Sequence, residues 1–313
     1  MPTPALISVD WGTTSLRCTL LAADGSIAAR REGGPGIQPP PPSGFAAVLA
    51  HETADWTPGP RPLPILMSGM IGSRQGWIEA PYLPCPAGAA DLAANLTHID
   101  AGSLGVIHLV PGMATAPTGR PPEAMRGEET QIVGALTDQS PSSQGGERLF
   151  VLPGTHSKWV STSAGAITAF ATYMTGEIFS ALRHHTILGR LMPEGTAPFH
   201  AVAFKKGVTA GAVEGHPGAL LNRLFATRTL GLFDQLAAAA LESYLSGILI
   251  GAELAAAASH QSFTIIGNAQ LSQRYGRAAE ILELDANVAA PDCAARGHWH
   301  IATAAGLVKE PHP

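Results

Sequence analysis

The sequence of 313 residues has few cysteines, no long hydrophobic stretch and, in its first residues, none of the basic character expected of a secretion signal. Its three cysteines, Cys18, Cys85 and Cys293, lie far apart without CxxC spacing, which argues against a disulfide framework and against a zinc site. No apolar run reaches the roughly 20 residues that a membrane-spanning helix needs. The first residues lack the basic segment of a secretion signal, so we expect a cytoplasmic protein with no membrane partner.

Several nucleotide-binding and catalytic patterns are also absent. There is no run of five or more Lys and Arg, and the formal net charge is −5, which argues against nucleic acid as the main partner. The chain has neither GxxxxGK[ST] nor GxGxxG, so the P-loop and Rossmann readings fail, and it lacks the GxSxG elbow of acyl hydrolases. A ligand that is an anion must therefore be bound by individually placed cations.

Strand and helix signals predict an α/β protein of two domains. Leu6–Asp10 and Arg17–Ala22 form a predicted hairpin, and Leu149–Leu152 begins a second strand, turn and strand arrangement. The Ser- and Gly-rich segment SPSSQGGE indicates a junction, so we place the domains at 1–140 and 141–313. Leu- and Ala-rich sequence predicts a helical insertion at about 177–245, and a final small-residue helix is expected over Ile301–Val308.

Small polar turns follow a strand in both halves of the chain. In the first, the hydroxyls and N–H groups of Gly12, Thr13 and Thr14 can surround an anion, and Asp10 at the strand end can hold Mg²⁺ through water. The alternative is a hairpin turn with a capped aspartate. The second turn has the same chemistry, and its candidate phosphate-binding residues are Gly154, Thr155, Ser157 and Lys158. Two such turns, one from each half, can clamp a nucleotide between two domains, although Lys158 can equally be a solvated cation.

Two adjacent carboxylates, Glu128 and Glu129, open the helix that precedes the junction. One of them can accept the proton of an attacking hydroxyl during phosphoryl transfer. The alternative is structural, because acidic side chains are favoured at any helix N-terminus by the helix dipole. The sequence does not distinguish which of the two would be the base.

Three further segments carry candidate ligand-binding residues. Arg74 lies in a Gly-rich stretch and can fork onto a carboxylate. His184 belongs to the helical segment Arg183-His184-His185, where we expect one polar contact rather than a metal site. Gly267 and Asn268 end a strand in a turn that suits the face of an adenine, although such turns occur in many folds.

Taken in order, these segments resemble the superfamily of actin, sugar kinases and heat-shock ATPases. VDWGTTSLR resembles its first phosphate motif, LPGTHSKW its second and IIGNAQ its adenosine motif, while GEETQIVGAL and HIATAAGLV resemble its two connecting helices. More narrowly, ISVDWGTTSLR, GMIGSRQGW, APYLPCPAG, MRGEETQIVGAL, LPGTHSKWV and YMTGEIFSALRHHTILGRL are similar to the 2-dehydro-3-deoxygalactonokinase family. The resemblance implies a two-domain actin-like ATPase (ribonuclease H-like) fold with a nucleotide cleft between the domains.

Membership of that family implies a function and a set of site residues. It implies transfer of phosphate from ATP, with Mg²⁺, to the 6-hydroxyl of 2-dehydro-3-deoxygalactonate in galactonate catabolism. Many sugar kinases of the superfamily use an Asp as the base at the start of the first connecting helix; here Glu128 and Glu129 stand there, and we favour Glu128. The substrate carboxylate needs a cation, for which we expect Arg74, Arg126 or Arg183.

Alternative functions remain compatible with the same segments. The acceptor can be another sugar or sugar acid, because epimers differ by one hydroxyl that only pocket contacts distinguish. A non-catalytic, nucleotide-binding actin relative would keep the fold, but it has no need of the sugar-side segments SGMIGSRQG and SALRHH. The apolar faces of the helical insertion also offer an interface for a homodimer.

Overall fold

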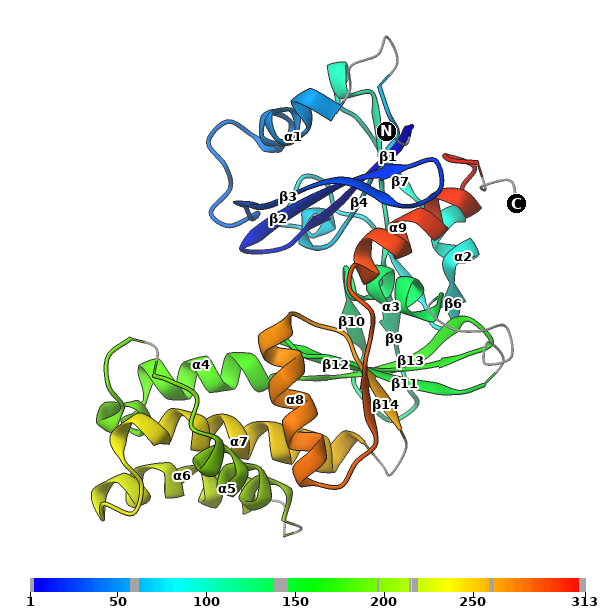
Figure 1. Cartoon of the computed structure of the whole chain (residues 1–313). Helices are drawn as coiled ribbons and strands as arrows, with labels where there is room; N and C mark the ends of the chain where they lie inside the picture. Colours follow the sequence, from blue (N-terminus) through cyan, green and yellow to red (C-terminus); the bar gives the residue numbers. More distant parts are fainter. Residues whose placement is uncertain are drawn as a thin grey trace. The chain divides into compact units, whose positions relative to one another are not determined.

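The computed structural model describes residues 3–56, 62–137, 146–195, 197–213, 215, 219–258 and 262–309. Its chain divides into two units, of which unit 1 comprises residues 1–147, 161–170 and 289–313 and unit 2 comprises residues 148–160 and 171–288. The mixture of sheets and helices in Figure 1 agrees with the predicted α/β class. The predicted domain boundary near residue 140 falls in the segment 138–145, which lies outside the described residues.

Unit 1 contains a six-stranded mixed sheet with the strand order β3-β2-β1-β4-β8-β7. Its strands are β1 (Pro4–Trp11), β2 (Ser15–Ala22), β3 (Ile27–Pro35), β4 (Ile65–Ser68), β7 (Thr97–Asp100) and β8 (Val106–Leu109). The antiparallel pairing of β1 with β2 confirms the predicted first hairpin. Because β1, β4 and β8 run parallel, their carboxyl ends lie at the same edge of the sheet, with Asp10 beside Ser68.

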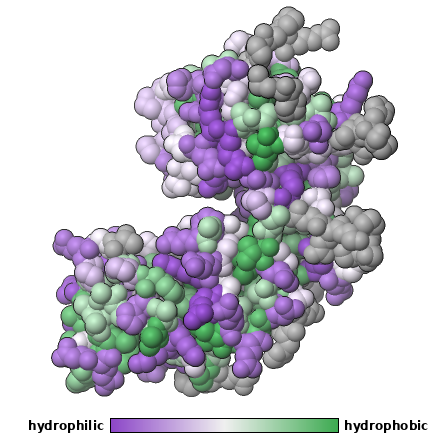
Figure 2. Space-filling model, in the orientation of Figure 1, coloured by the Kyte–Doolittle hydropathy of each residue, from purple (hydrophilic) through white to green (hydrophobic). Residues whose placement is uncertain are grey.

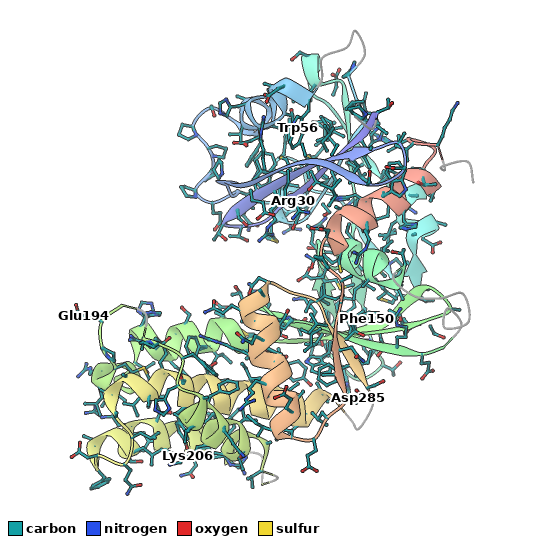
Figure 3. All side chains as sticks on the ribbon, viewed as in Figure 1. Arg30, Trp56, Phe150, Glu194, Lys206 and Asp285 are labelled. Atoms are coloured by element: carbon teal, nitrogen blue, oxygen red, sulfur yellow. The ribbon has the colours of Figure 1, made fainter. Side chains whose placement is uncertain are left out.

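Side chains alternate between the two faces of β1. Ile7, Val9 and Trp11 belong to the hydrophobic core of unit 1, which also holds Trp56, labelled in Figure 3. Ser8 projects from the opposite face, where its Oγ lies 2.7 Å from Nδ1 of the buried His298. One face of the strand is thus apolar, whereas the other carries polar side chains that include Asp10.

Shorter elements complete unit 1. A small sheet has the order β10-β9-β5, from β5 (Tyr82–Pro84), β9 (Gly112–Thr115) and β10 (Glu123–Met125). The remaining elements are α1 (Phe45–Thr53), β6 (Ala87–Gly88), α2 (Ala89–Ala94), α3 (Glu128–Leu136), α9 (Cys293–Ala304) and 3₁₀ turns at Ala54–Trp56, Met70–Gly72 and Gly102–Leu104.

Helices α3 and α9 pack against each other through glycine (Figure 1). A Cβ atom on Gly297 would lie 1.9 Å from the carbonyl oxygen of Thr130, and one on Gly134 would lie 1.9 Å from that of Cys293. The prediction of a final helix over Ile301–Val308 was wrong, because α9 begins at Cys293 and ends at Ala304. Gly306 adopts a φ of 70°, the left-handed conformation that ends helices.

A third sheet has the strand order β15-β14-β11-β12-β13-β6. Its further strands are β11 (Arg148–Leu152), β12 (Ser157–Ser163), β13 (Ala166–Tyr173), β14 (Phe263–Ile265) and β15 (Ala286–Val288). β11, β14 and β15 run parallel, so the turns that follow β11 and β14 lie at the same sheet edge. Phe150, labelled in Figure 3, is fully buried on β11.

The helices of unit 2 confirm that residues 177–245 are mainly helical. They are α4 (Thr175–His185), α5 (Ala201–Ala212), α6 (Ala219–Leu232), α7 (Ala238–Ala257) and α8 (Ala269–Ile281), with a 3₁₀ helix at Ile187–Leu191. By length and composition alone α7 could cross a membrane, but 72% of its apolar window is buried inside the protein. We therefore assign α7 as a core helix of unit 2.

Candidate active site

The first turn presents Asp10 and two threonines on a braced backbone. The N–H of Gly12 donates to the carbonyl of Ser15 at 2.9 Å, while Thr13 and Thr14 are exposed. The side chain of Asp10 is 16% exposed, and its Oδ2 accepts a hydrogen bond of 3.1 Å from Nη1 of Arg17. Burial raises the pKa of Asp10, and the charge of Arg17 opposes that rise. A partly desolvated carboxylate beside exposed hydroxyls suits a hard cation that carries phosphates.

Two glycines place the start of α3 next to this turn. Gly69 has a φ of 96°, and a Cβ there would lie 2.7 Å from the carbonyl oxygen of Trp11 and 3.4 Å from Oδ1 of Asp10. Gly127 has a φ of 104°, and its Cβ would lie 3.0 Å from Cα of Gly69. The backbone therefore runs in close contact from Asp10 to the N-terminus of α3, where Glu128 and Glu129 begin the helix.

The two glutamates have different surroundings. Glu129 is fully buried; its Oε2 accepts from the N–H of Gly127 at 2.7 Å, and its Oε1 lies 3.0 Å from Oγ1 of Thr130. Burial, followed by the nearby charge of Glu128, raises the pKa of Glu129 to about 8. Glu128 is half-buried, and its Oε2 accepts from the N–H of Arg126 at 3.0 Å. Glu128 is thus the more accessible carboxylate, whereas Glu129 holds a proton at neutral pH.

The two candidate arginines of unit 1 differ in burial. The side chain of Arg74 is 81% exposed and pairs with Glu79 at 2.9 Å. Arg126 is buried; its Nη2 donates to the carbonyl of Ala80 at 2.7 Å, and its guanidinium lies 4.3 Å from the centroid of the Tyr82 ring. The Nε and Nη1 atoms of Arg126 are buried without a hydrogen-bond partner among the described residues. Such donors are costly unless something accepts their hydrogen bonds.

Arg183 is committed to contacts within unit 2. Its Nε donates to Glu242 at 3.2 Å, and its Nη2 donates to the carbonyls of Pro193 and Gly195 at 2.6 Å and 3.2 Å. These bonds fix the segment after the 3₁₀ helix to the C-terminal end of α4. The guanidinium of Arg183 is therefore already satisfied by protein groups.

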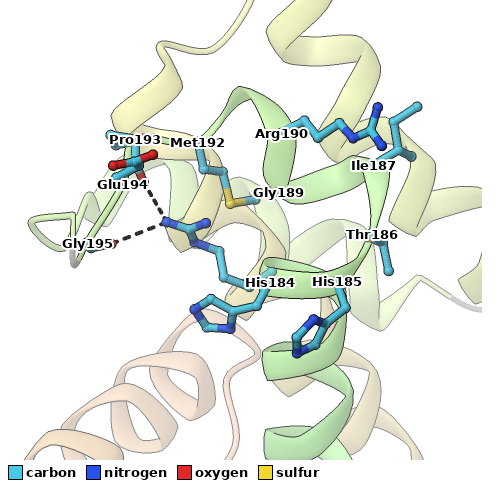
Figure 4. A pocket seen from close by; sticks show the side chains of 11 residues that line it. His184, His185, Thr186, Ile187, Gly189, Arg190, Met192, Pro193, Glu194 and Gly195 are labelled. Atoms are coloured by element: carbon cyan, nitrogen blue, oxygen red, sulfur yellow. Dashed lines mark hydrogen bonds between the residues drawn. The ribbon is translucent and has the colours of Figure 1, made fainter.

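A cavity of about 710 Å³ opens at the same end of α4. Figure 4 shows His184 and His185 on one side of it, with Arg190 and Glu194 on the chain that follows. Nδ1 of His184 lies 3.0 Å from the carbonyl of Ser180. α4 has eleven residues, which at a rise of about 1.5 Å each separates this cavity from the start of α4 by about 15 Å. The structure does not bring Arg183 and His184 to the second turn, which adjoins that start.

The second turn packs against α4 and against the adenosine motif. The carbonyl of Thr155 accepts from the N–H of Glu177 at 2.9 Å. A Cβ on Gly176 would lie 2.3 Å from the carbonyl oxygen of Gly154, and one on Gly267 would lie 3.6 Å from Cδ of Pro153. The structure thus brings together the second turn and the strand-end glycine that the sequence singled out.

Three of the predicted ligand residues of unit 2 have structural partners. Asn268 caps α8, where its Oδ1 accepts from the N–H of Leu271 at 2.9 Å. The ammonium of Lys158 donates to the carbonyl of His156 at 3.0 Å. The hydroxyl of Ser157 is buried and donates to Glu253 at 2.7 Å. These three side chains hold the backbone of the two turns, while Thr155 is exposed.

Glu253 is a residue that sequence reasoning missed. This buried carboxylate on α7 accepts hydrogen bonds from four neutral donors, which are Ser157 Oγ at 2.7 Å, Trp159 Nε1 at 2.8 Å, Tyr275 OH at 2.7 Å and Thr175 Oγ1. The donors come from β12, α4 and α8. Glu253 therefore ties the second turn to the helix that follows the adenosine motif. The signal in the sequence was a single carboxylate within the apolar segment LIGAELAAAA.

A second missed pair lies on the surface of the same turn. Nε2 of His156 lies 2.5 Å from Oε2 of Glu177, and each side chain is 50% exposed. The two residues are separated by 20 others in the chain, so the pairing depends on the position of α4 and no local pattern indicated it.

Comparisons with known proteins give a consistent result. The sequence model of the 2-keto-3-deoxy-galactonokinase family matches residues 10–301. A probable 2-dehydro-3-deoxygalactonokinase of Rhizobium meliloti is 36% identical over 92% of this chain and 93% of its own, and the 2-dehydro-3-deoxygalactonokinase of Escherichia coli is 33% identical over 93% and 95%.

Comparison with solved structures gives evidence on the fold. The crystal structure of a protein from Sinorhizobium meliloti, described as a 2-dehydro-3-deoxygalactonokinase, has a TM-score of 0.86 at 36% identity, covering 96% of this chain and 98% of that one. The ADPNP-bound activator of a 2-hydroxyisocaproyl-CoA dehydratase from Clostridium difficile has a TM-score of 0.51 at 12% identity, covering 99% and 100%. These likenesses agree with the predicted actin-like ATPase fold.

Proposed function

Because the chain belongs to the 2-keto-3-deoxy-galactonokinase family, we propose that it transfers the γ-phosphate of ATP to the 6-hydroxyl of 2-dehydro-3-deoxygalactonate. The observation that carries this proposal is the contact of Asp10, Gly69 and Gly127, which joins a phosphate-type turn to a helix that begins with two glutamates. A kinase needs these two groups in one place, because one serves the phosphates and the other the attacking hydroxyl.

Glu128 is the proposed general base. In the transfer step its carboxylate accepts the proton of the 6-hydroxyl, the hydroxyl oxygen bonds to the γ-phosphorus, and the bond from that phosphorus to the leaving oxygen of ADP breaks. Glu128 is half-buried, so its carboxylate can contact a substrate. Glu129 is fully buried and cannot make that contact. Glu129 remains protonated at neutral pH and so adds no second negative charge beside the base.

Asp10 is the proposed site for Mg²⁺. Among the described residues no cluster of three or more His, Cys, Asp or Glu side chains exists that could enclose a metal. A single carboxylate fits Mg²⁺, which usually keeps several waters and binds one or two carboxylates together with substrate phosphates. When bound, the ion neutralises phosphate charge. Asp10 would orient it, and the exposed hydroxyls of Thr13 and Thr14 would bind phosphate oxygens, while Gly12 braces the turn through its N–H bond to the carbonyl of Ser15.

The nucleotide contacts of unit 2 are proposed from the second turn and the adenosine motif. Gly154 and the exposed Thr155 would offer backbone N–H groups and a hydroxyl to phosphates. Ser157 and Lys158 would act on the turn mainly through their bonds to Glu253 and to the carbonyl of His156. Gly267 and Asn268, at the start of α8, would border the adenosine.

Arg126 is the proposed partner of the substrate carboxylate, since its Nε and Nη1 have no hydrogen-bond partner among the described residues, whereas Arg183 bonds to Glu242 and Arg74 to Glu79. Because both atoms are buried, this contact requires a local rearrangement when the substrate binds. We expect Arg126→Lys to raise the KM for the sugar acid by about 10- to 100-fold, because a lysine cannot form the bidentate pair. The KM for ATP should stay within about threefold. Steady-state kinetics with Arg74→Lys and Arg183→Lys as matched variants check this, and an equal effect of either would move the carboxylate site there.

The substrate itself is tested by following ADP release from ATP and Mg²⁺ with a panel of acceptors. The panel holds 2-dehydro-3-deoxygalactonate, its gluconate epimer, galactonate and glucose. We expect the kcat/KM for the first compound to exceed that of each other acceptor by at least about tenfold, as pocket contacts to one hydroxyl allow. Preference for another acceptor would change the substrate, and ADP release independent of any acceptor would indicate an ATPase of the same fold.

The assembly and location are also proposed. Large apolar side chains are exposed on and around α5 and α6, namely Phe199, Val202, Leu221, Phe225, Leu232 and Phe233. Figure 2 shows hydrophobic side chains among hydrophilic ones over these helices. Exposed apolar side chains that gather on one surface commonly mark interaction sites. They support a homodimer; the cytoplasmic location, without nucleic acid or a membrane as partner, stays a prediction from the sequence.

A further inference from the structure

The histidine and glutamate pair on the second turn has no role in the chemistry described above. His156 follows directly after Gly154 and Thr155, the proposed phosphate-binding residues, and its imidazole lies at the surface of the turn. Nε2 bonds to Oε2 of Glu177 at 2.5 Å, and both side chains are half exposed. A ligand at the turn would therefore meet this pair.

The main chain around His156 is fixed from two sides. Lys158 donates to the carbonyl of His156 at 3.0 Å, while the N–H of Glu177 donates to the carbonyl of Thr155 at 2.9 Å. Gly176 lies so close to Gly154 that a Cβ would approach its carbonyl oxygen to 2.3 Å. The imidazole is thus held in place before any ligand arrives, and little conformational entropy is lost when it makes a further contact.

The pairing leaves one ring nitrogen available. A carboxylate only accepts hydrogen bonds, so Nε2 carries a proton towards Glu177. Nδ1 makes no hydrogen bond among the described residues. When the ring takes up a second proton, Nδ1 becomes a donor with a full positive charge behind it. A phosphate at the turn favours that second proton, since an opposite charge nearby favours the ionised form.

We propose that His156 is a catalytic residue whose Nδ1–H donates to a non-bridging oxygen of the phosphoryl group in transfer, while Glu177 positions the imidazole. This inference rests on the proposed kinase function. His156 forms and breaks no covalent bond in this step; it stabilises the charge on the equatorial oxygens while the γ-phosphoryl group moves from ATP to the acceptor hydroxyl and ADP leaves. Glu177 keeps the imidazole in one orientation and supplies the compensating charge.

A structural role for the pair predicts a different result. Exposed ion pairs contribute about 0–1 kcal/mol to stability, and a glutamate in the first turn of a helix is favoured by the dipole whether or not a histidine faces it. Removal of His156 is thus expected to leave the fold and the melting temperature nearly unchanged. A large effect on kcat would have no structural explanation.

Two variants test the role by kinetics. We expect His156→Ala to lower kcat by about 10- to 100-fold, a loss comparable to that of one charge-stabilising donor, with the KM for the sugar acid within about threefold. Glu177→Gln should lower kcat less than His156→Ala does, because the imidazole stays but loses the carboxylate that orients it, and the KM for the sugar acid should again stay within about threefold.

The other titratable side chains near the pair are Lys158 on β12, Glu253 behind Ser157 on α7 and Tyr275 on α8. None of these bonds to the imidazole. His98→Ala and Glu280→Gln are matched controls, since His98 is an exposed histidine bonded to His108 and Glu280 an exposed helical glutamate paired with Arg277. Both controls should keep the wild-type kcat and the wild-type KM for the sugar acid.

A binding measurement separates this proposal from the kinase function itself. The His156 ring is followed by NMR and identified through its loss in His156→Ala. Addition of a non-hydrolysable ATP analogue with Mg²⁺ should shift the resonances of this ring at a fixed pH, whichever acceptor the enzyme uses. Unshifted ring resonances, or a wild-type kcat in His156→Ala, overturn the role of His156. A failure of all acceptors with shifted ring resonances overturns only the proposed substrate.

Discussion

Glu128→Gln is expected to lower kcat by about 10²- to 10⁴-fold, the contribution that general base catalysis usually makes. The amide keeps the size of the side chain and can still accept from the N–H of Arg126, so the start of α3 should be preserved. The KM values for ATP and the sugar acid should change little, because the proton is transferred only in the transition state. Steady-state kinetics with the preferred acceptor measure the effect.

Glu129→Gln is the matched variant one residue away. Its amide oxygen can still accept from the N–H of Gly127, and its NH₂ takes the place of Oε1, so the Thr130 hydroxyl, which donates to Oε1 in the wild type, would accept instead. We expect kcat to fall by less than about tenfold, far short of the general-base loss. A loss in Glu129→Gln as large as the one expected for Glu128→Gln, or a Glu128→Gln enzyme with wild-type kcat, would move the base to Glu129.

The same variant changes how stability depends on pH. Burial raises the pKa of the Glu129 carboxyl to about 8 in the folded protein from an ordinary value of 4.5, so between these values the folded protein binds more protons than the unfolded chain. The free energy of unfolding therefore decreases as pH rises from about 4.5 to 8, by a few kcal/mol from this group. We expect the free energy of unfolding, measured with urea, to decrease less between pH 5 and pH 9 in Glu129→Gln than in the wild type. An equal decrease in the two proteins would contradict the raised pKa of Glu129.

Asp10→Asn is expected to lower kcat/KM by about 10²- to 10³-fold, since a metal contributes several kcal/mol of charge stabilisation and each 1.4 kcal/mol is tenfold. An amide is a weaker ligand for Mg²⁺, and it leaves Arg17 without its carboxylate partner. We expect the Mg²⁺ concentration for half-maximal activity to rise at least tenfold. Activity titrated against Mg²⁺ at saturating ATP measures both quantities.

Asp24→Asn provides a control on the same sheet. Asp24 is exposed, and its Oδ1 accepts from the N–H of Ser26 at 2.9 Å in the turn after β2. This substitution should leave the Mg²⁺ dependence of activity as in the wild type. If Asp10→Asn shows the same Mg²⁺ dependence as Asp24→Asn, the metal is held elsewhere.

Local patterns predicted the parts of the site that are continuous in sequence. The β1–β2 hairpin, the start of α3 at Glu128 and the strand that precedes Gly267 each combine an apolar run with a glycine or a polar turn, and such signals act within about ten residues. Resemblance to one family then predicted the fold. The last helix was predicted too late in the chain, because small residues that favour a helix stand on both sides of Ala304. α9 ends at Ala304, and Gly306 follows with a positive φ.

Local sequence patterns could not predict contacts between residues that lie far apart in the chain. The sequence offered three arginines as partners for the substrate carboxylate, and only their contacts in the fold distinguish them. Arg183, for example, bonds to Glu242, which lies 59 residues later in the chain. The pairing of His156 with Glu177 likewise requires α4 to be in place. The predicted roles of Asp10, Glu128 and the phosphate-binding turns stay predictions until the variants are measured.

The four hydrogen bonds to Glu253 restrict how this enzyme can be altered. Positions 157, 159, 175 and 275 each supply one neutral donor to a single buried charge, so their substitutions should be strongly non-additive. Replacing Tyr275 with Phe changes what residue 157 must provide, although 117 positions separate them. A library meant to alter the second turn should therefore randomise these positions together with 253, since a change at one of them alters what each of the others must supply.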